Sequence, residues 1–331
     1  AFLVNRETLN APEYQAENDR YNRVLGIDYN LASPDNLWTG KFYVHKSFQP
    51  GDNEGNISSQ AFMIYNSRNW RFAADFVYVD EEFRSDLGFV PRRGIFKTGQ
   101  SATRNFYPKQ SSIGQHGIRI LALNFWRPQL DFQNTDHEYR LSWVAAFKNQ
   151  SNLELRYSNR YVFLTNAFDP TRTAGGVPLP SNTGYYFNQF YSEYQSSPTN
   201  LLTYFGSLRV GEFFNGNSFS VSSRLGVRLQ PWAQISLAVN YDGIRLPAPH
   251  PSADLWLVTP RFDITFSKSL FWSTLFQYSN QRNNLGINSR LQWRFAPLSD
   301  LYLVYNDNYF TEDFSPRFRS INLKVSYWLN I

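Results

Sequence analysis

Hydrophobic and polar residues alternate along much of this chain. In the stretch 285–295, LGINSRLQWRF, the odd positions hold Leu, Ile, Leu, Trp and Phe with one Ser, and the even positions hold Gly, Asn, Arg, Gln and Arg. Successive side chains of a β-strand point to opposite faces, so a period of two predicts a strand with one apolar and one polar face. The same pattern recurs at 136–149, 217–230 and 320–331.

About 18 alternating stretches follow one another from end to end, most of them roughly ten to fifteen residues long. They are about twice as long as the strands of soluble sheets, and they suit the roughly ten residues that a tilted strand needs to cross a bilayer. The predicted strands span 1–8, 22–32, 37–48, 58–67, 70–83, 96–108, 117–132, 136–149, 151–165, 183–196, 201–214, 217–230, 233–247, 253–266, 270–283, 285–297, 300–310 and 320–331.

The connections between these strands are short and long in turn. Short links include SRN (67–69) and SKS (267–269), whereas NAPEYQAEND (10–19) and 166–183 are long. Short turns on one rim and long loops on the other are typical of outer-membrane barrels. The sequence therefore predicts an all-β fold in a single domain over 1–331: a transmembrane antiparallel outer-membrane β-barrel of about 18 strands, with 16 as the alternative.

Composition excludes several other classes of protein. No window approaches the roughly 18 uninterrupted apolar residues of a membrane-spanning helix, and the mean hydropathy is −0.47. The net charge of +5 is modest and the basic residues are scattered, so we expect no nucleic-acid partner. The chain has no cysteine, which removes disulfides and cysteine-bound zinc, while its 29 Phe, 21 Tyr and 9 Trp make it unusually aromatic.

Charged residues recur on the polar parity of the predicted strands, where they would face the lumen. One interpretation is an internal ladder of ion pairs that stiffens the wall, with Glu138 and Arg140 facing Glu154 and Arg156 on the next strand. The other is a cationic lumen that favours anionic or sugar-like solutes, and both can hold together. The predicted lumen charges are Arg140, Arg156, Arg160, Arg224, Arg228, Arg290, Arg294, Lys324, Glu138, Glu154, Asp75 and Asp263.

Tryptophans lie near predicted strand ends or on the apolar parity, as the aromatic girdles of a membrane barrel require. A sugar-stacking platform is the alternative, with Tyr185, Tyr186 and Phe187 as its loop candidates; the girdle is favoured. The predicted interface tryptophans are Trp38, Trp70, Trp143, Trp232, Trp272, Trp293 and Trp328.

Motifs that carry chemistry are missing from the sequence. The four histidines are scattered without metal-ligand spacing, and no nucleophile elbow, P-loop or dinucleotide fingerprint occurs. The loop GDNEGN (51–56) brings Asp52 and Glu54 together, but it lacks the spacing of a calcium loop and is better explained as a solvated turn. We therefore expect no cofactor, no metal and no enzyme.

Two segments resemble a family of bacterial outer-membrane proteins. They are 79–92, VDEEFRSDLGFVPR, and 285–309, LGINSRLQWRFAPLSDLYLVYNDNY. In that family a carbohydrate-binding module of the family 9 type precedes a C-terminal barrel domain of unknown function. The resemblance implies that the chain is this barrel and that an upstream module would lie in the periplasm.

The expected function is that of a pore or docking barrel in the bacterial outer membrane, for a polar solute that is carbohydrate or anionic. A scaffold subunit of a larger outer-membrane complex, with an occluded lumen, is the alternative, and a carbohydrate-active enzyme built from the loops is third. The expected partners are membrane lipid, other outer-membrane proteins and carbohydrate.

Overall fold

The chain forms one antiparallel sheet of 18 strands, in a computed structural model that describes residues 1–7, 20–51 and 53–329. This confirms the predicted fold class and the count of 18 rather than 16. The strands are β1 (Phe2–Glu7), β2 (Tyr21–Ala32), β3 (Trp38–Phe48), β4 (Ile57–Asn66), β5 (Trp70–Val79), β6 (Ile95–Phe106), β7 (Ile113–Arg127), β8 (Gln133–Phe147), β9 (Asn152–Leu164), β10 (Thr183–Gln195), β11 (Leu202–Phe213), β12 (Gly216–Leu229), β13 (Ala233–Arg245), β14 (Ala253–Thr265), β15 (Leu270–Ser279), β16 (Asn284–Ala296), β17 (Ser299–Phe310) and β18 (Pro316–Ser326).

Each strand pairs with the strands before and after it in the sequence, so the sheet is an uninterrupted meander. Links after even-numbered strands are short, as at 67–69 and 297–298. Links after odd-numbered strands include the long segments 80–94 and 165–182. The two ends of the strands are called the short-turn rim and the long-loop rim below.

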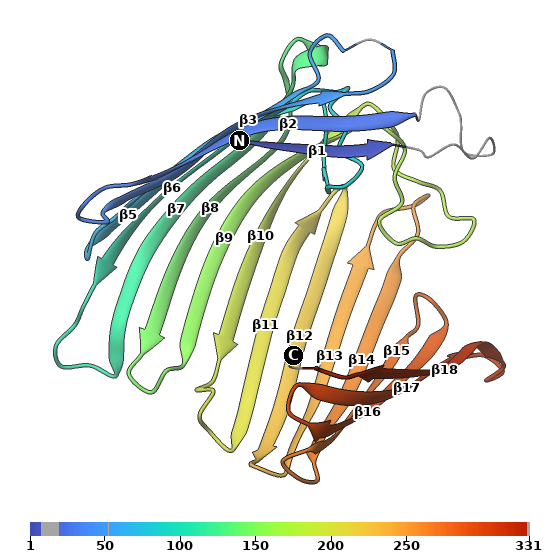
Figure 1. Ribbon diagram of the computed structural model, residues 1–331. Helices are drawn as coiled ribbons and strands as arrows, with labels where there is room; N and C mark the ends of the chain where they lie inside the picture. Colours follow the sequence, from blue (N-terminus) through green and yellow to red (C-terminus); the bar gives the residue numbers. More distant parts are fainter. Residues whose placement is uncertain (8–19, 52, 330–331) are drawn as a thin grey trace.

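The sheet curls like the wall of a barrel (Figure 1), with β1 and β18 at its two edges. Strand twist makes a meander of this length curl rather than lie flat. Among the residues that the structure describes, no register joins β1 to β18. β1 has 6 described residues, fewer than any other strand.

The two faces of the sheet differ as the alternation predicts. Large apolar side chains such as Leu225, Leu303 and Ile321 are exposed on the convex, outer face. Soluble proteins rarely expose so extensive an apolar surface, whereas lipid requires one. In the described part of the chain no helix is long and apolar enough to cross a membrane.

Buried apolar side chains gather in two small clusters on the inner face, each beneath a loop from the long-loop rim. In one, Phe83 of segment 80–94 packs with Val24, Val79 and Ile95. In the other, Leu179 of segment 165–182 packs with Ile244 and Leu246. Two long loops therefore fold into the mouth of the curved wall instead of extending from it.

Two strands depart most from their predicted spans. β7 covers Ile113–Arg127 rather than 117–132, and the other is the last strand, β18. It begins at Pro316 rather than 320 and ends at Ser326 rather than 331. A proline has no N–H to donate, but it is tolerated at the first residue of an edge strand, where that N–H is not needed. Tyr327 to Leu329 lie beyond the strand, and Ile331 falls outside the described residues.

Candidate functional site

The registers place all twelve predicted lumen charges on one face of the sheet. Glu138 lies opposite Arg160 and Leu123, Leu123 lies opposite Gly99, and Gly99 lies opposite Asp75. These residues of the five strands β5 to β9 therefore point to the same face. The same stepwise pairing extends to the remaining strands. This surface, concave and polar, is called the inner face. It carries Asp75, Glu138, Arg140, Glu154, Arg156, Arg160, Arg224, Arg228, Asp263, Arg290, Arg294 and Lys324.

Several of these charges pair within a strand rather than across strands. Arg140 Nε lies 2.6 Å from Glu138 Oε1, and Arg156 Nη2 lies 2.8 Å from Glu154 Oε1. The prediction that Glu138 and Arg140 lie opposite Glu154 and Arg156 is wrong. The residue opposite Glu138 is Arg160, whose Nε lies 3.9 Å from Glu138 Oε2. The ladder of charges exists, but it combines ion pairs between residues two apart on one strand with cross-strand pairs such as Lys97–Asp75 at 2.7 Å.

Four arginines form a row across the inner face. They lie on alternate strands, and one residue of the strand between them separates each from the next. These separating residues are Thr103 on β6, Ser142 on β8 and Tyr191 on β10. The four arginines, called the arginine row, are Arg71 on β5, Arg119 on β7, Arg156 on β9 and Arg209 on β11. Adjacent strands lie about 4.8 Å apart, so the arginine backbones repeat about every 10 Å.

The arginine row carries more positive charge than nearby carboxylates neutralise. In the described part of the chain no ion pair reaches Arg71, Arg119 or Arg209, and only Arg156 has a carboxylate partner. The Nε of Arg119 is buried without a hydrogen-bond partner among the described residues. Arg156 and Arg209 both stack on the ring of Tyr191, with guanidinium carbons 4.5 and 5.7 Å from its centroid. Stacking holds the two cations in place and leaves the N–H donors of Arg209 available, while Arg156 also donates to Glu154.

Segment 80–94, called the strap, is fastened to β1 and β2 around Asp86. Asp86 accepts hydrogen bonds from Arg84 Nε at 2.6 Å and from Arg6 Nε at 2.9 Å. The side chain of Asn22 binds the strap backbone twice, donating to the carbonyl of Arg84 and accepting from the amide of Asp86. Ser47 Oγ accepts from the amide of Arg84. Burial would raise the pKa of Asp86, but the hydrogen bonds from Arg84 and Arg6 hold it below its ordinary value.

The other end of the strap is fastened to β8. Arg92 Nη2 lies 2.6 Å from Asp136 Oδ2, and the Arg92 guanidinium stacks on Phe125 at 5.0 Å. Gly94 ends the strap with a φ of 63°, and a Cβ there would lie 2.6 Å from Gln129 Nε2. Only glycine adopts this conformation without strain at so close an approach. Asp86 and Arg92, the first and last residues of DLGFVPR, are thus its two anchors.

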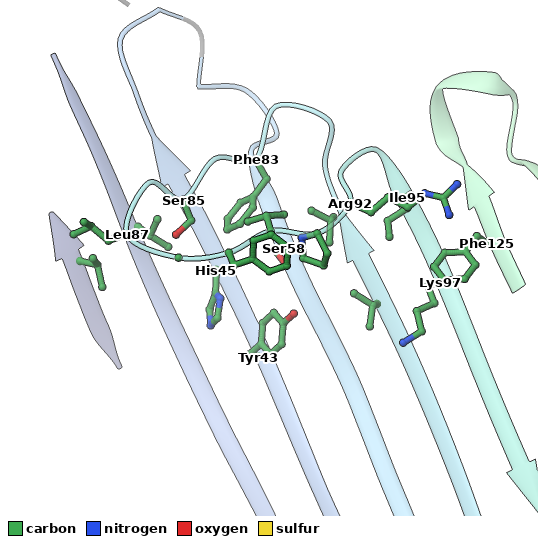
Figure 2. Close-up of a pocket in the computed structure, with 18 of the residues that line it drawn as sticks. Tyr43, His45, Ser58, Phe83, Ser85, Leu87, Arg92, Ile95, Lys97 and Phe125 are labelled. Carbon is green, nitrogen blue, oxygen red and sulfur yellow. The ribbon is translucent and has the colours of Figure 1, made fainter. Parts of the chain in front are cut away.

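A cavity of about 860 Å³ lies between the strap and the inner face of β1 to β7. Figure 2 shows Tyr43, His45 and Lys97 on the floor strands and Ser85 and Leu87 on the strap above them. Apolar side chains form most of the lining, namely Phe2, Val4, Val24, Val77, Val79, Phe83, Leu87, Phe89, Val90, Pro91, Ile95, Leu123 and Phe125. We call it the strap cavity. The sequence pointed to the strap only through the family resemblance. Asp86 and Arg92, which flank the apolar run of DLGFVPR with opposite charges, were the signal that could have predicted an anchored loop.

The second inward loop, 165–182, closes over β9 to β14. Its Leu179 is fully buried, and Asp169 accepts hydrogen bonds from the amides of Thr171 and Thr173. The aromatic residues considered for sugar stacking belong to β10 and not to a loop. Phe187 is 1% exposed, so it is not available for the open stacking platform that was the alternative to the girdle.

The predicted interface tryptophans gather at one rim. Trp232 lies in a short turn, and the others lie within four residues of a strand end on the short-turn rim. Trp38, Trp70, Trp143, Trp272 and Trp293 are on the outer parity. Trp328 follows β18 directly. This arrangement has the geometry of a girdle at one membrane interface.

The groups considered for metal binding stay apart. In the described ranges no three His, Asp or Glu side chains are close enough to hold an ion. Asp52, half of the acidic pair in 51–56, lies outside those ranges. His45 contacts Asp28, His116 contacts Trp143, and His250 contacts the carbonyl of Val177.

A polar cluster on the outer face is a feature that the sequence did not reveal. The fully buried Asp307 on β17 accepts hydrogen bonds from Tyr305, Tyr309 and Arg319 near the long-loop rim. A carboxylate on the lipid-facing parity is costly unless it is paired in this way. Its Tyr-x-Asp-x-Tyr spacing on one face was the available signal.

Comparison with known proteins gives remote matches only. No family model matches the chain, and no curated protein does. Among solved structures, it is similar to the siderophore receptor PirA from Pseudomonas aeruginosa, with 12% identity, a TM-score of 0.47, and coverage of 87% of this chain and 67% of that chain. It is also similar to the ferric enterobactin receptor PfeA from Pseudomonas aeruginosa, with 9% identity, a TM-score of 0.44, and coverage of 92% of this chain and 67% of that chain. For the siderophore receptor PirA from Acinetobacter baumannii, the identity is 8% and the TM-score 0.42, and the match covers 87% of this chain and 65% of that chain.

Proposed function

We propose that this chain is a bacterial outer-membrane barrel that binds and passes a polar, anionic solute along its inner face. Lipid covers the outer face in this proposal. The observation that carries it is the arginine row, in which three of four guanidinium groups have no ion pair in the described part of the chain. An acidic carbohydrate is the solute that fits both this row and the family resemblance of residues 79–92, which would add a carbohydrate-binding module upstream.

The chemistry of the row favours repeated anionic groups. Guanidinium is permanently charged and binds carboxylate or sulfate through two parallel hydrogen bonds. Thr103 and Ser142 separate the arginines with small side chains that are themselves buried, at 5% and 3% exposure, so the guanidinium groups rather than these hydroxyls would contact a chain-like solute. An extended polyanion can therefore contact several arginines in succession.

Ion selectivity in planar bilayers tests the proposal. The full-length chain should conduct with a reversal potential that shows preference for chloride over potassium, and Arg119→Gln combined with Arg209→Gln should reduce that preference. The matched control is Arg104→Gln, because Arg104 stacks on Trp70 and Phe106 on the outer parity. Cation preference in the unmodified protein, or an equal loss in the control, would refute the proposal.

A scaffold role is the second candidate, and the two inward loops favour it. The strap and segment 165–182 both fill part of the mouth, each around its own apolar cluster. A folded protein that carries no current under any condition would support the scaffold and exclude the pore. In that case the arginine row would serve as a docking surface for an acidic partner segment.

A further inference from the structure

We propose that the strap cavity is a binding site for a small amphipathic anion, with an aromatic or aliphatic body and one carboxylate-type head group. This site is separate from the arginine row and goes beyond the proposed function, since binding there requires no conduction. The proposal is supported by the size of the cavity, the chemistry of its lining and the fixed position of its roof.

The size and lining of the cavity suit an apolar ligand body. A volume of about 860 Å³ lies in the range of about 300–1,000 Å³ that small-molecule sites occupy. The valines of β2 and β5 form the floor, and Leu87 and Phe89 extend from the strap. Phe89 is 90% exposed and Leu87 is 64% exposed, which is costly in a polar lumen and is relieved when a ligand covers them. Burying both side chains on a ligand favours binding.

The ionisable groups of the cavity favour an anionic head. His45, Arg92 and Lys97 line it, and the lining contains no carboxylate. Their partners Asp28, Asp136 and Asp75 lie on the same inner face and pair with them, but they do not line the cavity. Lys97 donates one hydrogen bond to Asp75 at 2.7 Å, and an ammonium has three N–H groups to donate. A ligand carboxylate can therefore be added to this pair without breaking it.

The roof of the cavity is held before any ligand arrives. Asp86 fastens one end of the strap to Arg6 of β1, and Arg92 fastens the other end to Asp136 of β8. Between these anchors the residues Leu87 to Pro91 span the cavity (Figure 2). A loop that is already ordered loses little entropy on binding, so the apolar contacts contribute directly to affinity.

Thiol protection can measure binding, because residues 1–331 contain no cysteine. Ser85 lines the cavity from the strap, and Ser85→Cys supplies a single reactive thiol there. The probes are biphenyl-4-carboxylate and the isosteric neutral biphenyl-4-carboxamide. The proposal expects both to slow alkylation of the thiol in the detergent-solubilised full chain, with half-protection by the carboxylate at roughly tenfold lower concentration. Equal protection by the two probes, or none, would overturn it.

Two further substitutions in the Ser85→Cys background separate the body from the head group. Val77→Phe fills the cavity and should abolish protection by both probes; Val304→Phe, an inner-face control on β17, should not. Lys97→Gln should weaken protection by the carboxylate about tenfold and leave the carboxamide within about twofold. Its control is Lys41→Gln, an inner-face lysine on β3 outside the cavity. Protection that survives Val77→Phe would place the probe in the micelle and refute the site.

Discussion

The anchor at Asp86 allows a quantitative test of how the strap is held. Asp86→Asn keeps the shape of the side chain and removes its charge, so the hydrogen bonds from Arg6 and Arg84 lose their ionic component. Hydrogen bonds to a charged group contribute about 1.5–3 kcal/mol, and the Asp86 side chain is only 20% exposed, so solvent screens them little. We expect the free energy of strap opening to fall by about 2 kcal/mol.

Amide hydrogen exchange reports this opening directly. The amides of Arg84 and Asp86 are hydrogen-bonded to the side chains of Ser47 and Asn22, so they exchange only when the strap lifts. Because about 1.4 kcal/mol corresponds to a factor of ten, peptides covering 80–94 should exchange about 30-fold faster in Asp86→Asn. Unchanged exchange in that segment would refute the assignment of Asp86 as an anchor.

The second inward loop supplies the control. Asp169 also accepts backbone hydrogen bonds in a loop, but from the amides of Thr171 and Thr173 and not from a guanidinium. Asp169→Asn should leave hydrogen exchange in the strap unchanged and speed exchange only in its own loop, because the amides that lose a charged acceptor both lie in that loop.

The pH dependence of strap opening follows from the lowered pKa of Asp86. A carboxyl whose pKa is lower in the folded state stabilises that state above its unfolded pKa, about 4, and this stabilisation is lost as pH falls through the folded value. Strap exchange, corrected for the intrinsic rate, should therefore stay flat from about pH 8 to about pH 5 and rise only below about pH 4. A rise near pH 6 would instead implicate a histidine.

Three further predictions concern the wall and its loops. Leu179→Ala should destabilise loop 165–182 by about 2–5 kcal/mol, seen as faster exchange in that loop, while an effect on the strap would contradict the separation of the two clusters. Leu303→Arg, on the lipid-facing side, should lower the free energy of unfolding in lipid vesicles by about 2–4 kcal/mol, measured with denaturant. Val304→Arg, on the inner face, should lower it far less. Phe89→Ser should leave the unfolding midpoint unchanged, because that ring is almost fully exposed, and should weaken protection by both biphenyl probes.

The wall was largely predictable from the sequence, because a period of two is local information. The alternation at 285–297 gives β16 (Asn284–Ala296) to within one residue, and the parity of Arg290 and Arg294 gives their face. What the sequence could not supply was the register between strands. The opposition of Glu138 and Arg160 depends on a relative shift that neither strand encodes alone.

The inward loops were not predictable for a related reason. Long loops on one rim were expected, but their direction depends on contacts with distant strands. The strap is fixed by Asn22, 64 residues before Asp86, and by Asp136, 44 residues after Arg92. Alternation carries no information about such contacts. The charged ends and apolar centre of DLGFVPR were visible in the sequence, but only the fold shows which partners they have.

The distribution of buried residues implies that the wall and its loops are separate energetic units. The described inner face holds most of its buried apolar residues in two small clusters, one under each loop, while the apolar outer face is left for lipid. The wall is therefore stabilised by its backbone ladders and its surroundings, and each loop by a few local contacts. Substitutions under the strap should release the strap without unfolding the sheet. The lining of the strap cavity can consequently change, and with it the ligand, at little cost to the barrel that carries it.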